Sequence, residues 1–189
     1  MTKLEFDIIF AIPDGDYDEL DLSNAVFEAG FEDAVVGTGL PGLLAVALEM
    51  EGEDAESVIV STARDILKQL PKGSTLREVR PDLVSLSDVA KKLDVKRQAL
   101  QKRREMPMPA ISGYYRVTEI AEAIFTITAT SLRQPRFNVH IATPWLNAGI
   151  GAQTLNARIA LGEVDPENME YRATDKKDIP PAYQIHAGA

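Results

Sequence analysis

The chain has 189 residues, 45% hydrophobic and 26% charged, which is a composition typical of globular proteins rather than disordered or membrane-spanning chains. It contains no cysteine, which excludes disulfides, a thiol nucleophile and a thiolate metal site. No apolar run approaches the roughly 20 residues that cross a bilayer, and the first residues lack the long apolar region of a signal peptide. We therefore expect a cytoplasmic protein with no membrane association.

The net charge of −9 is distributed unevenly along the chain. Residues 1–84 hold 18 acidic and 6 basic side chains, whereas residues 85–116 hold 8 basic and 3 acidic ones. Because a local basic patch is what contacts phosphate, the middle segment is the candidate for nucleic-acid binding despite the acidic total.

Residues 1–82 alternate between strand and helix patterns and predict an acidic domain. Apolar, β-branched runs suggest strands, and apolar residues at helical spacing suggest two helices, one with Leu20, Leu22, Val26 and Phe27 on its buried face. The order β-α-β-β-α-β predicts a ferredoxin-like domain, so the fold class is α+β. The strands are expected at 4–12, 34–38, 43–50 and 75–79, and the helices at 16–29 and 54–70.

Two features of this domain have a functional and a structural interpretation. Alternate carboxylates between Asp14 and Asp21 suit a calcium loop, but the rest of an EF-hand loop is absent. Acids that flank a helix N-terminus are the simpler interpretation. Gly37 to Gly42 lacks the Lys-Ser/Thr of a phosphate loop and is interpreted as a turn. We therefore predict no metal and no cofactor.

Residues 83–130 predict a helix-turn-helix with a short wing. Ser85 is a good N-cap, and a first helix follows with Leu86, Val89, Ala90 and Leu93 on its inner face. Asp94 marks the turn, and the second helix is expected over Lys96–Glu105. The two prolines at 107 and 109 require an extended chain, so residues 109–117 should form the wing.

The predicted second helix and wing carry the side chains that read DNA. Lys and Arg hold phosphates, Arg pairs bidentately with guanine, and Gln does so with adenine in the major groove. For the tyrosines, packing under the wing and contact with DNA are both open. A solvated basic helix in an ordinary helical hairpin is the alternative for the whole segment. The candidate DNA-binding residues are Ser87, Lys96, Arg97, Gln98, Gln101, Lys102, Arg104, Tyr115 and Arg116.

The segment from Ser85 to Ile124 resembles the helix-turn-helix of the excisionase/AlpA and MerR-related group of small bacterial and phage DNA-binding proteins. The resemblance implies a helix-turn-helix, a basic wing and a following helix. It departs from the group at Asp94, where Gly is usual, and at Ile124-Phe125, where Trp is usual. The matching positions are 88–90, 93, 95–100, 106–109, 115–116 and 118–120.

The remaining chain, residues 131–189, is predicted as a C-terminal extension for dimerisation or an arm. A strongly apolar helix should start at Thr118 and precede it. A strand is expected over Phe137–Ala142 and a helix over Trp145–Leu161, weakened by two glycines. From Gly162 onward the pattern predicts an arm or a frayed tail.

Together these features predict a sequence-specific regulator of transcription that binds double-stranded DNA. We expect a bacterial or phage repressor or autoregulator, a homodimer that inserts Lys96–Glu105 in the major groove. No nucleophile, base and orienting residue combine into a catalytic arrangement, so no enzyme is predicted. The alternative is a protein-interaction module, such as an antitoxin or phage adaptor, whose acidic domain binds a basic protein partner. A third hypothesis makes the acidic domain a small-molecule sensor.

Overall fold

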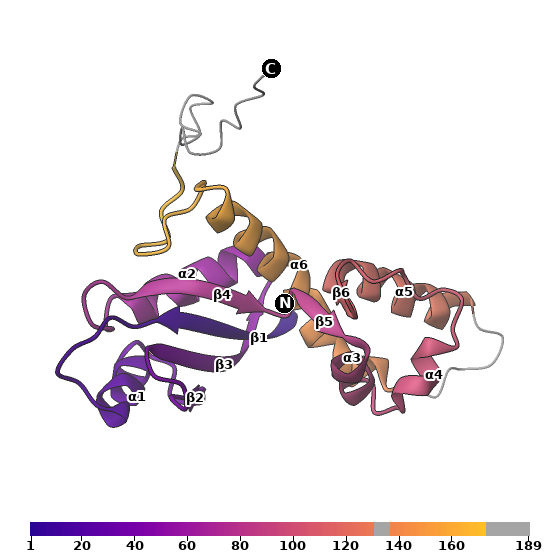
Figure 1. Cartoon of the computed structure of the whole chain (residues 1–189), viewed down its shortest axis with the longest axis horizontal. Helices are drawn as coiled ribbons and strands as arrows, with labels where there is room; N and C mark the ends of the chain where they lie inside the picture. Colours follow the sequence, from indigo (N-terminus) through magenta and orange to yellow (C-terminus); the bar gives the residue numbers. More distant parts are fainter. Residues whose placement is uncertain (131–136, 173–189) are drawn as a thin grey trace, which may run out of the picture.

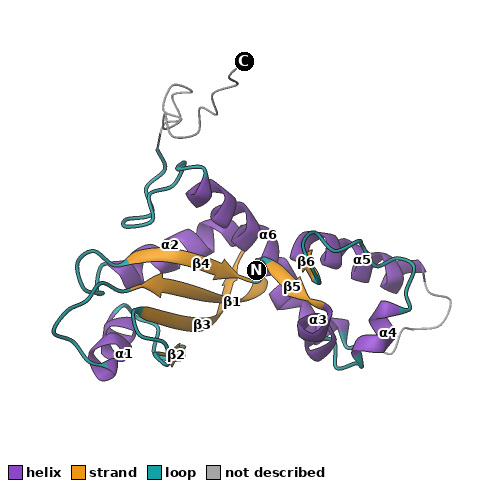
Figure 2. Cartoon of the chain, in the orientation of Figure 1, coloured by secondary structure: helices purple, strands orange, loops and turns teal. Residues whose placement is uncertain are grey.

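The computed structural model describes residues 1–130 and 137–172 and combines helices with sheet, which confirms the α+β prediction. A four-stranded sheet with two helices forms one part of the molecule, and short helices with a two-stranded sheet form the other (Figures 1 and 2). The elements are β1 (Thr2–Ala11), α1 (Glu19–Glu28), β2 (Val35–Gly37), β3 (Leu43–Gly52), α2 (Ala55–Leu67), β4 (Thr75–Arg80), β5 (Leu83–Ser85), α3 (Leu86–Lys92), α4 (Arg97–Gln101), β6 (Tyr114–Arg116), α5 (Val117–Thr130) and α6 (Val139–Ala160).

The larger sheet has the strand order β2-β3-β1-β4, and every neighbouring pair is antiparallel. β1 pairs with β3 over its whole length, from Thr2 opposite Gly52 to Ala11 opposite Leu43. Because successive side chains of a strand point to opposite faces, alternate residues of β1 enter the core. These buried residues are Leu4, Phe6, Ile8 and Phe10.

Both helices of this part begin at an aspartate that caps the first turn. Asp18 accepts hydrogen bonds from the N–H groups of Leu20 and Asp21 at 2.8 and 2.9 Å, and the Asp21 carboxylate accepts one from the Asp18 N–H. Asp54 accepts from the N–H of Ser57 at 2.8 Å. Asp18 and Asp21 thus serve the start of a helix, as the simpler interpretation of this acidic stretch predicts.

The observed ends of these elements differ from the predicted ones by a few residues. α1 begins at Glu19 rather than at residue 16, because Asp18 is the cap. The buried face of α1 then falls on Leu22, Ala25 and Val26, so the prediction that Leu20 and Phe27 share this face is wrong: they are 65% and 39% exposed. α2 ends at Leu67 instead of residue 70.

Helix α6 spans both parts of the molecule and contributes to two hydrophobic cores (Figure 1). Ala142, Trp145 and Leu146, near its start, pack in the core of α3, α4 and α5. Further along, the helix packs against the sheet and α2 through Ala148, Ala152 and Leu155. One continuous helix therefore ties the basic part of the chain to the acidic part.

The strand predicted over Phe137–Ala142 is wrong, because Val139 already begins α6. The glycines that seemed to weaken this helix allow it to pack closely instead. A Cβ on Gly149 would lie 2.6 Å from Val117 Cγ1, and one on Gly151 would lie 2.6 Å from the backbone at the start of α2. The two glycines lower the helix propensity of α6 at these positions, but they allow other elements to approach the helix closely.

Residues 163–172, which the sequence suggested as an arm or a frayed tail, pack against the sheet part. Val164 and Met169 are fully buried there. The N–H of Leu76 on β4 donates to the carbonyl of Pro166 at 2.8 Å. The rest of the predicted tail, residues 173–189, and residues 131–136 lie outside the described residues.

Candidate nucleic-acid interface

The first helix of the basic segment, α3, starts as the sequence predicts. Ser85 Oγ accepts a hydrogen bond from the N–H of Asp88 at 3.2 Å, and the Asp88 carboxylate accepts one from the Ser85 N–H at 3.0 Å. This reciprocal capping box fixes the chain as it leaves β5. Leu86, Val89 and Ala90 are buried on the inner face.

A tight turn joins α3 to α4. Asp94 has a φ of 53°, in the left-handed region, which short polar side chains tolerate better than most others. The N–H of Val95 then donates to the carbonyl of Ala90 at 2.9 Å, and Asn138 N–H donates to the Leu93 carbonyl at 3.2 Å. The turn therefore takes the left-handed conformation with Asp in place of Gly, and the start of α6 holds it.

The second helix is shorter than predicted, because α4 covers only Arg97–Gln101 rather than Lys96–Glu105. Lys96 is its N-cap residue and Lys102 its C-cap residue, and Arg104 lies beyond the helix. The proline at 107 disfavours helical geometry at Met106, which packs against the second core instead.

Eight of the nine predicted DNA-binding side chains are exposed at the surface. Tyr115 is the exception, since it is half-buried and packs against the second core, whereas the neighbouring Tyr114 is 49% exposed. Packing under the wing, one of the two open interpretations of the tyrosines, thus describes Tyr115. The exposed residues are Ser87, Lys96, Arg97, Gln98, Gln101, Lys102, Arg104 and Arg116.

In the part of the chain that the structure describes, the cations around α4 are unpaired, whereas half of the other Lys and Arg residues form ion pairs. Among the described residues, ion pairs join Lys68 to Asp65 at 2.7 Å and Arg80 to Glu78 at 2.9 Å in the sheet part. No ion pair within the described chain involves the exposed cations of α4 and its ends. The cations of this set are Lys96, Arg97, Lys102 and Arg104.

Arg103 was not among the predicted contacts, and the structure gives it a packing role. Its guanidinium lies 5.4 Å from the ring centroid of Phe137, and its side chain is half-buried. This cation–π contact holds the chain after α4 against the start of α6. No local pattern in the sequence indicates it, because the partner lies more than 30 residues away.

The wing is built on a strand pair that the sequence did not reveal. β6 pairs with β5, with Leu83 opposite Arg116 and Val84 opposite Tyr115. Val84 and Tyr115 face the core, so Leu83 and Arg116 point outward. The strand that supports the predicted wing thus comes from before α3. Arg116 also lies 3.6 Å from Glu119, a weak exposed pair.

The face of the larger sheet away from its helices is acidic. Glu5 and Glu49 are direct cross-strand partners, and Asp7 follows two residues along β1. Partial burial raises the pKa of Asp7 above its usual range, although Arg80 across the sheet acts in the opposite direction. A hollow of about 700 Å³ beside this face is lined by five carboxylates, those of Glu5, Asp7, Glu32, Asp33 and Glu49.

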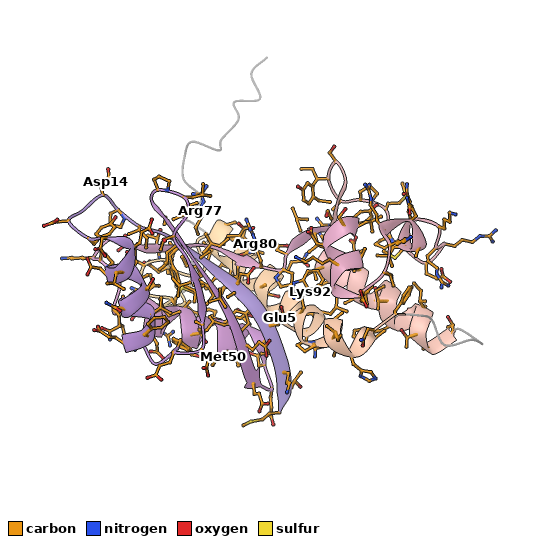
Figure 3. All side chains as sticks on the ribbon, turned by 90° about the horizontal axis from the view of Figure 1, so that it is seen from below. Glu5, Asp14, Met50, Arg77, Arg80 and Lys92 are labelled. Carbon is orange, nitrogen blue, oxygen red and sulfur yellow. The ribbon has the colours of Figure 1, made fainter. Side chains whose placement is uncertain are left out.

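One ion pair joins the acidic face to the basic segment. Lys92, the last residue of α3, binds the Glu5 carboxylate and lies 5.9 Å from the ring centroid of Trp145 (Figure 3). Both charged side chains are about one-third exposed. Lys92 therefore serves the contact between the two parts of the molecule and not the exposed cationic surface.

In the described residues, no three His, Asp or Glu side chains gather closely enough to hold a metal ion. None of the helices in this part of the chain has the length and apolar character needed to cross a membrane. The sequence matches no known protein family, and neither a curated protein nor a solved structure matches the chain.

Proposed function

We propose that the chain is a sequence-specific regulator that binds double-stranded DNA through α3, α4 and the wing. The observation that carries this proposal is the set of exposed, unpaired cations on α4 and at its ends. In the sheet part several basic residues are paired with carboxylates, whereas these four cations have no internal partner among the described residues. A surface of this kind fits a polyanion.

Each side chain has a role that its chemistry supports. Arg97, Gln98 and Gln101 lie on α4 itself and are suited to base edges in the major groove. The N-terminal residues of a recognition helix make such contacts, so a helix of five residues offers enough length. The remaining polar and basic groups hold phosphates and fix the orientation: Ser87, Lys96, Lys102, Arg104 and Arg116.

The proposal extends to the regulator's assembly and its class. A single short recognition helix gives little specificity, so we propose a homodimer that reads a palindrome and acts as a repressor or autoregulator. The resemblance of residues 85–124 to the excisionase/AlpA and MerR-related group supports a bacterial or phage origin.

For the first part of the chain we propose a ferredoxin-like domain. The β-α-β-β-α-β element order and the antiparallel strand order β2-β3-β1-β4 support it. Because its open sheet face is acidic, we place this domain away from the DNA.

Two measurements on the purified protein test DNA binding. Log K should fall with log salt concentration by about 0.9 per phosphate contact, so the four cations assigned to phosphates, Lys96, Lys102, Arg104 and Arg116, give a slope of about −3.6 per protomer. Arg97→Ala with Gln101→Ala should abolish the preference for the selected site over random DNA, while circular dichroism stays unchanged. Equal site preference in the double variant would show that α4 does not read the sequence.

A second candidate function rests on the acidic hollow of the sheet. In this alternative the N-terminal part binds a basic protein partner, and α3 and α4 serve a structural purpose. The hollow and its carboxylates support it. Binding of a lysine-rich peptide that is lost in Glu49→Gln but kept in Arg97→Ala, together with no DNA binding, would favour this alternative.

A further inference from the structure

The tip of the wing exposes large apolar side chains that the fold does not use. Met108 is 84% exposed, Ile111 59% and Tyr114 49%. They occur within a run of seven residues, 108–114, that also contains Pro109. Single exposed apolar residues are ordinary on protein surfaces, but several within one short projecting segment mark a contact site.

The backbone holds this tip in a narrow turn. The Ala110 N–H donates to the Tyr114 carbonyl at 2.8 Å, and the Tyr114 N–H donates to the Ile111 carbonyl at 2.6 Å. Gly113 has a φ of 80°, a conformation that favours glycine. Pro109 fixes the chain before the turn. The apolar side chains are therefore presented on a preorganised loop, which loses little conformational entropy on binding.

Basic residues outnumber acidic ones on either side of the tip in the sequence. Lys102 and Arg104 are exposed before it, together with Glu105, and Arg116 is exposed after it. A partner must then supply both anionic groups and an apolar slot. Duplex DNA has this combination in its minor groove, where phosphates line two edges and the base steps between them accept Met, Ile or Pro side chains.

We propose that Met108 and Ile111 form a wedge that enters the minor groove, opens a base step and kinks the DNA. This inference rests on the proposed function, because it assigns a second contact of the same DNA-binding surface. Wedges of this type bend the duplex by about 20–90° toward the major groove. Such a bend makes recognition depend on how easily the sequence at the kink deforms, with pyrimidine–purine steps favoured.

The test uses the full chain and a DNA site selected from a random pool. Energy transfer between dyes at the two DNA ends reports bending, and 2-aminopurine at successive positions reports an unstacked base. The wild-type protein should shorten the end-to-end distance and raise 2-aminopurine fluorescence at one step. Met108→Ser with Ile111→Ser should remove both signals while DNA is still bound with several-fold lower affinity. Leu161→Ser, at a 72% exposed position on the other part of the molecule, is the matched control and should behave as wild type.

Each remaining outcome decides the question. Binding of straight, fully stacked DNA by the wild-type protein would overturn the wedge and leave the proposed function intact. Bending that survives in the double variant would also overturn the wedge. Absence of binding to any DNA would overturn the proposed function together with the wedge. Met108-dependent binding to phosphatidylserine vesicles without DNA bending would identify a lipid surface as the partner and refute the proposal.

Discussion

Replacing Gly151 with alanine tests whether α6 packs as closely on the sheet part as the structure shows. The added Cβ would lie 2.6 Å from Ala55 C and Glu56 N, and both atoms belong to the backbone at the start of α2. Real Cβ atoms essentially never approach this closely, so one of the two helices must move. Because backbone is involved, no side-chain rotation relieves the contact.

Two opposing effects determine how much Gly151→Ala changes the free energy of unfolding. Alanine is favoured over glycine inside a helix by about 1 kcal/mol. Overpacking at a site that cannot yield costs about 3 kcal/mol, the upper end of its usual range. The net loss is then about 2 kcal/mol, which corresponds to a fall in Tm of about 4–8 °C for a chain of this size.

Thermal unfolding followed by circular dichroism measures this change, with chemical denaturation as a second probe. Gly39→Ala is the control, because a Cβ there would meet nothing within 4 Å and its stability should change by no more than about 0.5 kcal/mol. If Gly151→Ala raises Tm instead, helix propensity dominates and α6 does not approach α2 as described.

Substitutions at three other places in the fold probe further contacts. Hydrogen bonds from Ser57 hold the pKa of Asp54 below its usual range. Since a lowered folded-state pKa stabilises the protein above the ordinary pKa, Asp54→Ala should cost about 1 kcal/mol at pH 7. This cost should decrease as the pH falls below about 4, whereas Asp54→Asn should keep the cap. A double-mutant cycle of Lys92→Ala and Glu5→Ala should give a coupling of about 0.5–1 kcal/mol, and a value near zero would show that this pair does not join the two parts. Leu100→Ala, at a fully buried position, should cost about 2–5 kcal/mol, and a neutral effect would contradict the packing of α4.

Local signals in the sequence were sufficient for most elements of the first 130 residues. The Ser85–Asp88 capping box and the alternating apolar residues of β1 act between near neighbours, so their patterns are legible in the chain itself. Type and order of these elements were therefore predictable. Their ends were less so, because the capping residue and the tertiary contacts decide where a helix stops.

The features that escaped prediction depend on residues far apart in the chain. β5 forms through its pairing with β6, with Leu83 opposite Arg116, and beyond α4 the side chains of Arg103 and Met106 contact other elements. Gly149 and Gly151 suggested a weak helix, since sequence alone cannot show the elements that approach them. Tertiary packing overrides propensity in each of these cases.

The candidate interface was predicted as a set of residue types, and the structure adds their exposure. Exposed cations at 96, 97, 102 and 104 followed from the amphipathic pattern around Leu100. The sequence did not show which of Tyr114 and Tyr115 is exposed and which packs on the core, because the register of β6 on β5 decides this. A one-residue shift of that register would exchange the two side chains between core and surface.

The proposal that this chain reads DNA is tested most directly by selection of the full-length protein against a random pool of duplex DNA. We predict enrichment of one palindromic motif. The enrichment should be lost when Arg97 and Gln101 are both replaced by alanine, and it should not return when only one of the two residues is wild type. If the protein retains DNA but no motif is enriched, or if it retains no DNA at low salt, sequence-specific DNA binding by α4 is contradicted.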